Sequence, residues 1–475
     1  MIFADLLFLF LFLPIVLGVY FLFKKTSFRN VVLVVFSLIF YAWGEPLYIF
    51  VLCFSTMLDY TLGIIMQKYD DNPKIRKAAM LTSVIVNLSL LGLFKYGGFL
   101  AENLNMIIGR DLFNINLPLP IGISFYTFQT LSYTIDLYKR RIDVQRNPIN
   151  FAAFVTMFPQ INAGPIVRYA NIQHEINERK ISTEDVSAGI TRFVIGLAKK
   201  VIIANQVGAA TATILSGSVT ATGSVEGMTV GGAWLGLFFF GLQAYYDFSG
   251  YSDMAIGIGR VFGFRFPENF NYPFISKSIS EFWRRWHMTM GGFFRDYVYI
   301  PLGGNRVKKV RYFMNIMVVW FLTGLWHGAS WNFAIWGLYF GFLMIIERAF
   351  LLKFAEGLPK PLQLIRTPVT FFAITFSWSL FYFEDFSEMF MFLKTMFGIG
   401  GNGLYDTATM NLLYDKIFIV IIAAVFCAPV YKYIERLVER AKLGWITPVF
   451  NAGLLILCAV MLVGDSYNPF LYFRF

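Results

Sequence analysis

Long apolar runs are the feature of this sequence that most limits its fold. Stretches such as Ile2–Phe23, Leu47–Met66 and Ala78–Phe94 carry few charges, and about 20 apolar residues form a helix long enough to cross a bilayer. A transmembrane barrel would show short segments of alternating polarity instead. Only 15% of the residues are charged, against about 25% in a soluble domain. The sequence therefore predicts an all-α, polytopic membrane protein.

The basic residues predict which loops face the cytosol. Lys and Arg gather in cytoplasmic loops, and segment 260–311 holds ten of them beside three acidic residues. From this alternation we expect about 11–12 transmembrane helices, with the N- and C-termini extracytoplasmic. Segment 151–167 contains Pro and Gly and suits a broken or re-entrant helix. No soluble domain or repeat is evident, so 1–475 is expected to form a single integral-membrane domain.

The net charge of +11 has two readings. A basic protein can bind nucleic acid, but the positive charge here follows the loop pattern of a membrane protein. We therefore expect membrane lipids, and no nucleic acid, as partners. The three cysteines lie in apolar runs without metal-ligand or redox spacing, so we expect core packing and no metal site.

Two of the three histidines lie in segment 246–331, the candidate catalytic core. His287 occurs in WRRWH and His327 in LWHG, each directly after a tryptophan. Ionisable groups at membrane depth are usually functional, and imidazole can act as a general base near neutral pH. A core histidine that donates to a backbone carbonyl is the competing interpretation. The third, His174, lies in a polar stretch and is expected at the surface.

The motifs around these histidines resemble the membrane-bound O-acyltransferase (MBOAT) family. The resemblance rests on DFSGYSDMAIGIGRVFGFRFPENFNYPF, FWRRWHMTMGGFFRDYVYIPLGG and GLWHGASWNF, and it extends to FPQINAGPIVRY and the closing YNPFLYFRF. It is strongest to the bacterial branch typified by the membrane subunit of alginate O-acetyltransferase. It implies helices around a central tunnel or funnel, with His327 at the family's signature position and His287 at that of a second histidine.

The resemblance also implies a reaction and partners. An acetyl group would pass from cytosolic acetyl-CoA, a substrate rather than a permanently bound cofactor, across the bacterial cytoplasmic (inner) membrane. The acceptor would be an exported SGNH, esterase-like acetyltransferase that O-acetylates an extracytoplasmic polysaccharide such as alginate. D-alanyl transfer to teichoic acid from a carrier-protein thioester stays open. A polymer or lipid transporter is a further alternative, although it would be expected to show repeat symmetry.

Basic and aromatic residues beside His287 are candidates for binding the donor. Arg284, Arg285 and Arg295 could hold its phosphates, or they could simply set the topology. We expect His287 to lie within a helix, where Trp283 and Arg284, four and three residues earlier, share its face. We include Trp283 with the three arginines as the predicted donor site.

Four polar residues come ahead of this basic segment. They are Asp247, Ser249, Ser252 and Asp253. Such side chains can line a tunnel or cap a helix through their oxygens, and we expect capping.

Overall fold

The structure, a computed structural model, describes residues 1–217, 225–352, 357, 359–399, 401–464, 467, 468 and 471. Within these residues all regular elements are helices, which confirms the predicted all-α class. The chain forms two compact units: Met1–Phe193 with Tyr251–Glu268, and Val194–Gly250 with Asn269–Phe475. The end of the chain after 471, predicted to be extracytoplasmic, lies outside the described residues.

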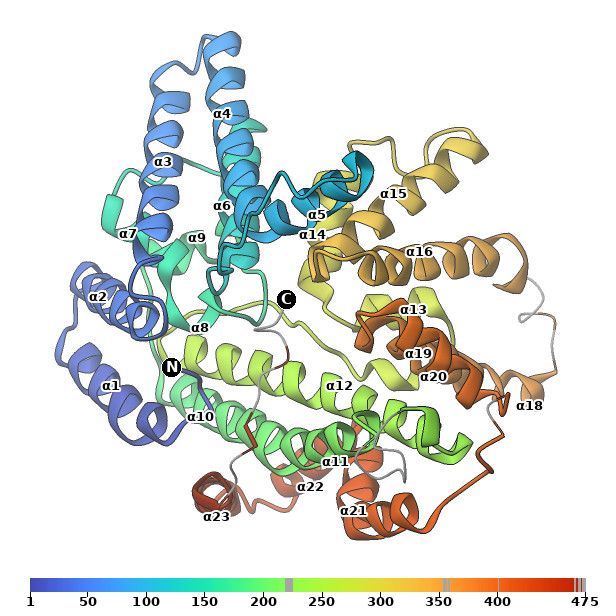
Figure 1. The fold of residues 1–475 in the computed structure, drawn as a ribbon. Coiled ribbons are helices and arrows are strands. Elements are labelled where there is room, and N and C mark those ends of the chain that lie inside the picture. Colours follow the sequence, from blue (N-terminus) through green and yellow to red (C-terminus); the bar gives the residue numbers. More distant parts are fainter. Residues whose placement is uncertain are drawn as a thin grey trace. The chain divides into compact units, whose positions relative to one another are not determined.

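In the first unit, α6 packs against α3, α4, α7 and α9. Helices α3 and α4 run side by side, and α6 packs against both (Figure 1). Asn72 begins α4, because its side chain accepts hydrogen bonds from the N–H groups of Lys74 and Ile75. The helices are α1 Leu13–Leu22, α2 Thr26–Gly44, α3 Ile49–Lys68, α4 Pro73–Leu91, α5 Gly97–Ile108, α6 Ile123–Tyr138, α7 Pro148–Thr156, α8 Phe158–Ile161 and α9 Tyr169–Asn177.

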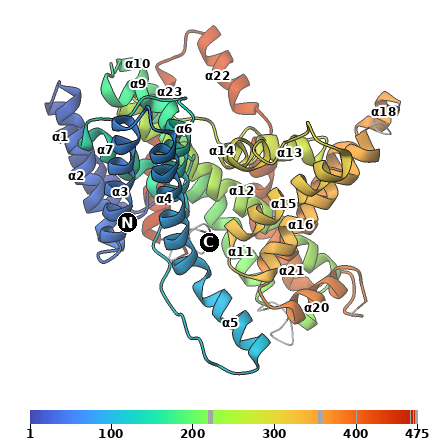
Figure 2. The same ribbon diagram turned by 90° about the horizontal axis from the view of Figure 1, so that it is seen from above.

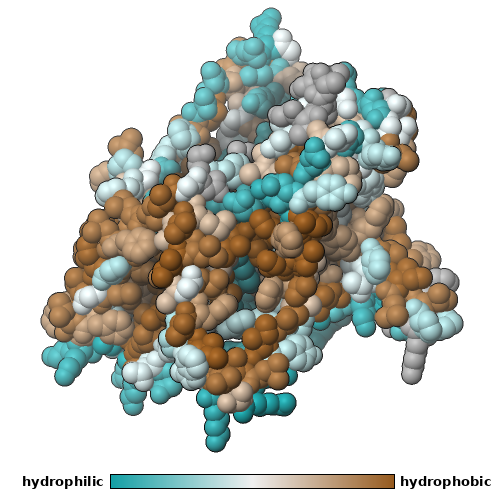
Figure 3. All heavy atoms as spheres, turned by 90° about the horizontal axis from the view of Figure 1, so that it is seen from below, coloured by the Kyte–Doolittle hydropathy of each residue, from teal (hydrophilic) through white to brown (hydrophobic). Residues whose placement is uncertain are grey.

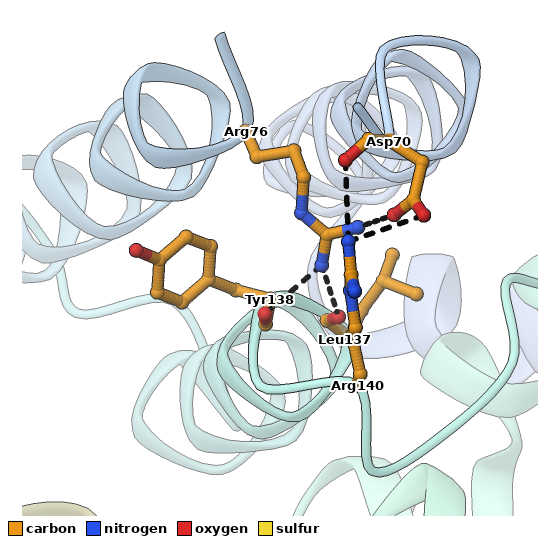
Figure 4. A network of polar contacts seen from close by, with 5 residues as sticks. All are labelled: Asp70, Arg76, Leu137, Tyr138 and Arg140. Carbon is orange, nitrogen blue, oxygen red and sulfur yellow. Dashed lines mark hydrogen bonds and ion pairs between the residues drawn. The ribbon is translucent and has the colours of Figure 1, made fainter. Parts of the chain in front are cut away.

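A polar network joins the α3–α4 turn to the end of α6 (Figure 4). The Arg76 guanidinium donates to the carbonyl oxygens of Leu137 (3.2 Å) and Tyr138 (2.9 Å), which are among the last carbonyls of that helix. Asp70 forms ion pairs with Arg76 and with Arg140. Basic groups at a helix C-terminus satisfy its free carbonyls and interact well with the helix dipole, so Arg76 has a structural role at the end of α6.

The expected broken helix is present in segment 151–167. Helix α7 ends at Thr156, and α8 begins at Phe158 with Pro159 in its first turn. The residues around the break are buried. Irregular backbone is tolerated in a membrane protein where protein covers it, which agrees with this burial.

The second unit contains a tight hairpin of α15 and α16, which lie side by side in Figures 1 and 2. A Cβ added to Gly324 would lie 2.3 Å from the Phe333 carbonyl oxygen, and one on Gly337 would lie 2.2 Å from that of Trp320. The helices can therefore approach this closely only with glycine at both positions.

Eleven described helices belong wholly to the second unit, and two more contribute residues to both units. The eleven are α11 Asn205–Leu215, α13 Ile279–Arg285, α14 Met288–Phe294, α15 Lys309–His327, α16 Trp331–Ile346, α18 Lys360–Gln363, α19 Arg366–Tyr382, α20 Phe386–Met396, α21 Thr407–Phe426, α22 Val430–Arg440 and α23 Ile446–Gly464. The two that contribute to both units are α10 Thr183–Ala198 and α12 Val230–Val261.

Five π-helical segments and two 3-10 segments complete the described helices. The π segments are Phe8–Phe12, Gly92–Tyr96, Lys199–Ala204, Arg295–Tyr299 and Glu347–Leu351, and the 3-10 segments are Val225–Gly227 and Pro273–Ile275. All π segments except the first contain charged residues. Such turns are often found at functional sites, and Lys200 and Glu347 from two of them have buried partners described below.

Seven helical segments among the described residues are long and apolar enough to cross a membrane. They are Thr26–Gly44, Ile49–Lys68, Pro73–Ile108, Trp331–Leu351, Pro361–Tyr382, Thr407–Phe426 and Ile446–Gly464. The 11–12 crossings expected from the charge pattern include segments that fall outside this length and hydropathy limit. Among them are the first apolar run, whose apolar helix Phe8–Leu22 is short, and Trp234–Tyr246, which lies in the largely buried α12. A helix covered by protein can carry polar residues that lipid would not accept.

Apolar side chains are also abundant on the surface. Figure 3 shows them over a broad part of one face. Leu22, Phe418 and Val463 are each at least 75% exposed. A bilayer, rather than water, is the medium that suits such a surface. The chain is therefore a multi-pass membrane protein.

Candidate active site

His327 is the last residue of α15 and is 1% exposed. Its imidazole ring packs edge-on against three aromatic rings, with centroid distances of 5.0 Å to Trp326, 4.9 Å to Trp336 and 5.6 Å to Phe381. The α15–α16 hairpin and α19 supply these rings. The structure thus places His327 where the sequence predicts it, at the end of an apolar helix, and packs its ring against aromatic side chains.

His287 lies in a break between two helices, so its predicted helical position is wrong. It joins α13 to α14 with φ 44° and ψ 52°, the left-handed region. Its ring packs against Phe248 at 4.7 Å and Trp326 at 5.5 Å. Trp283, expected on the same helical face, instead contacts the rings of Trp320, Trp336 and Phe340. Because α13 ends at Arg285, before His287, the helical face that His287 was expected to share with Arg284 is also absent.

The two histidines share one neighbour, although they are 40 residues apart. The Trp326 indole lies against both rings, at 5.5 Å from His287 and 5.0 Å from His327. Both imidazoles therefore belong to one buried aromatic cluster in the second unit. His174 is exposed on α9, as predicted.

Asn269 contacts His287 and was not singled out from the sequence. Its Oδ1 lies 3.0 Å from Nδ1 of His287 and 2.9 Å from the Thr289 hydroxyl oxygen. Asn269 and His287 are both fully buried. Burial lowers the pKa of the His287 imidazole from its ordinary value of 6.5 to about 3. The ring is therefore neutral at pH 7.

A small pocket opens beside His327. It has room for about one water molecule. The indole N–H groups of Trp336 and Trp378 have no hydrogen-bond partner among the described residues. The pocket is lined by Phe240, Ala244, Trp286, His327, Trp336, Trp378, Phe381 and Leu471.

A buried ion pair lies next to Leu471, one of the residues that line this pocket. The Asp247 carboxylate lies 2.7 Å from Lys200 Nζ, and it also accepts a hydrogen bond from the Leu471 N–H at 2.9 Å. The capping role predicted for Asp247 and its three polar neighbours is wrong, because all four lie inside α12. Asp253, the last of them, pairs with Arg192 at 2.8 Å.

The predicted donor-binding arginines are exposed or half-buried, and two of them pair with acidic residues. Arg285 pairs with Glu281 at 2.9 Å, and Arg295 pairs with Asp296 at 2.7 Å. Arg284 and Arg295 are exposed to solvent. The hydrogen bonds and ion pairs described for Arg285 and Arg295 lead to acidic groups and a backbone oxygen rather than to a histidine. Their role in donor binding stays a prediction.

Comparison with known proteins connects this geometry to a family. The profile of the membrane-bound O-acyltransferase family matches residues 35–383. The chain is 38% identical to the probable alginate O-acetylase AlgI of Pseudomonas aeruginosa, over 87% of this chain and 78% of that protein. It is 32% identical to the peptidoglycan O-acetyltransferase of Helicobacter pylori, over 99% and 96%. A teichoic acid D-alanyltransferase of Bacillus subtilis is 33% identical, over 48% and 59%. With both histidines inside the matched region, the chain belongs to the membrane-bound O-acyltransferase family and is an acyltransferase.

Proposed function

We propose that this protein moves an acetyl group from cytosolic acetyl-CoA across the bacterial cytoplasmic membrane to an exported acceptor, for O-acetylation of an extracytoplasmic polysaccharide. Relatives named for acetylation of alginate and of peptidoglycan align with 87% and 99% of the chain. The D-alanyltransferase aligns with 48%, so D-alanyl transfer is the weaker candidate. The polymer itself is left open between alginate and other surface glycans.

One observation carries the catalytic part of the proposal: two buried imidazoles pack against a single indole. In the reaction, a hydroxyl oxygen of the acceptor attacks the thioester carbonyl carbon. The C–O bond forms, the C–S bond breaks and CoA leaves as a thiolate that takes up a proton. His327 removes the hydroxyl proton as general base, and His287 orients a reactant or relays the proton.

The pocket supports this assignment through its donors. The carbonyl oxygen of a thioester gains negative charge as the nucleophile attacks, and fixed N–H groups stabilise that charge. The indole nitrogens of Trp336 and Trp378 are donors only and lack partners among the described residues. Both residues line the same pocket as His327, so an acyl oxygen held there would complete their hydrogen bonding.

The donor and the acceptor are proposed to approach from opposite sides. Arg284, Arg285 and Arg295 would hold the phosphates of acetyl-CoA at the cytosolic face, with Trp283 buried behind them. An exported esterase-like acetyltransferase would receive the acetyl group and pass it to the polymer. Both termini would then lie outside the cytoplasm.

Acetyl transfer in membrane vesicles tests the proposal. With labelled acetyl-CoA outside inverted vesicles and the exported fraction inside, His327→Ala is expected to lower transfer roughly 10²–10⁴-fold, the usual contribution of a general base. His174→Ala, at an exposed histidine, is the matched control and should transfer at the wild-type rate. Transfer that survives in His327→Ala would reject the catalytic role. Transfer from a D-alanyl carrier protein but not from acetyl-CoA would reject the proposed donor.

A further inference from the structure

Backbone hydrogen bonds join the segment that contains Asn269 to the residues on either side of His287. The Asn269 carbonyl oxygen accepts a hydrogen bond from the Met288 N–H at 2.9 Å, and two residues later the Asn271 N–H donates to the Arg285 carbonyl at 2.9 Å. These backbone bonds fix segment 269–271 against the break that contains His287. The Asn269 side chain therefore extends from a backbone position that is fixed close to His287.

The atom that Asn269 presents to His287 can be identified from Thr289. The amide oxygen and nitrogen of asparagine are hard to tell apart by shape, so the hydrogen-bond network must decide between them. The Thr289 backbone N–H, which can only donate, points at this atom from 3.4 Å, and the Thr289 hydroxyl lies 2.9 Å away. An NH₂ group here would face a second donor. The atom is therefore the oxygen, which can only accept.

This assignment determines the state of the histidine. Nδ1 of His287 lies 3.0 Å from the same oxygen, so Nδ1 must carry the hydrogen and donate it. A neutral imidazole has one N–H and one basic nitrogen, and the bond made by one nitrogen sets the role of the other. We infer that Asn269 is a positioning residue that holds His287 in the Nδ1–H tautomer and so leaves Nε2 as the basic nitrogen for proton transfer. The catalytic meaning of this inference rests on the proposed acetyl transfer.

The tautomer can be measured without any assay of activity. The chain contains only three histidines, so protein labelled with ¹⁵N-histidine and reconstituted in lipid should give three resolvable imidazole pairs. His174→Ala and His327→Gln assign the His287 signals by elimination. We expect a protonated Nδ1 and an unprotonated Nε2 in wild type. In Asn269→Leu we expect this preference to be lost. A protonated Nε2 in wild type, or an unchanged tautomer in Asn269→Leu, would overturn the inference even if the proposed reaction proved wrong.

Transfer rates separate positioning from packing. Asn269→Leu keeps the number and branching of the side-chain heavy atoms but removes the acceptor, and should lower transfer about 10–100-fold, the usual effect of removing a partner that orients a functional histidine. Asn269→Asp keeps an acceptor oxygen and should retain more activity. Its carboxylate favours imidazolium, so the acid limb of its pH–rate profile should move to higher pH. A packing role predicts the opposite order, with Leu tolerated and the buried charge of Asp harmful, and that result would refute positioning.

A neighbouring asparagine supplies the matched control. Asn271 is exposed, and its contacts to Arg285 run through the backbone. Asn271→Leu should therefore leave the ¹⁵N pattern of His287 and the rate of transfer unchanged. Thr289→Val removes one hydroxyl donor from the Asn269 oxygen and should have a smaller effect than Asn269→Leu. A loss in Asn271→Leu as large as that in Asn269→Leu would show that the segment, rather than the amide, matters.

Discussion

The buried pair of Lys200 and Asp247 predicts a large loss of stability when only one partner is removed. Lys200 is 5% exposed and Asp247 1%, with 2.7 Å between their charged atoms. In Lys200→Met the carboxylate would stay buried without its cation, which costs about 3–5 kcal/mol. Replacing both partners by apolar residues should cost less, because no charge is then stranded. The Leu471 N–H would still lose its acceptor, worth about 1–3 kcal/mol.

An exposed pair of the same length provides the control. Arg295 and Asp296 are also 2.7 Å apart, but the Arg295 side chain is 65% exposed. Arg295→Met should therefore lower stability by about 1 kcal/mol or less. The free energy of unfolding can be followed by titrating the purified protein from mild detergent into SDS. Two results would refute the reasoning. One is an equal loss of stability in Lys200→Met and Arg295→Met. The other is a loss in the double variant Lys200→Met/Asp247→Leu that equals the sum of the losses in its two single variants.

Three further predictions concern the second unit. Trp336→Phe removes the indole N–H together with part of the ring that lines the pocket and packs against His327, and it should lower the transfer rate about 10–10³-fold with little change in the KM for acetyl-CoA. Trp320→Phe makes the same change in ring size and is the control, because that N–H already contacts Met344 sulfur; equal losses in the two variants would reject the role. Glu347 accepts the first two N–H groups of α13, so Glu347→Ala should cost about 2–4 kcal/mol in the same SDS titration, and an unaltered midpoint would contradict this. The pKa of His287 falls from 6.5 to about 3 on folding, so between these pH values the unfolded chain binds one more proton than the folded chain. The stability that the neutral imidazole contributes should therefore be complete above pH 6.5 and decline toward pH 3, by up to about 1.4 kcal/mol per pH unit. A decline just as steep in His287→Asn would count against this prediction.

The membrane class and the two histidines could be read from the sequence because each has a local signature. Apolar runs of membrane length are visible without any tertiary contact. His287 and His327 stand out because the chain holds only one other histidine. The break in 151–167 was also predictable, since proline and glycine mark it.

The remaining parts of the site depend on contacts between distant residues. Nothing in WRRWH marks the left-handed turn at His287, since no glycine or proline interrupts the helical pattern. The sequence could not show that Asp247 pairs with Lys200, because Lys200 lies 47 residues earlier in the chain. Helix capping was therefore the expected role of Asp247. Trp378 and Leu471 reach the pocket from α19 and from beyond the last helix. Asn269 lay within a recognised motif, 18 residues before His287, but only the fold shows which atom it presents.

The left-handed backbone at His287 restricts how this position can be altered in the laboratory or by evolution. At φ 44° most side chains crowd their own backbone, at roughly 1–2 kcal/mol, whereas Asn, Asp and Gly are accommodated more readily. An alanine scan would therefore confuse the loss of the imidazole with a distorted turn. His287→Asn and His287→Gly are the cleaner replacements, and we expect natural diversity at this position to be drawn from the same short list of residues.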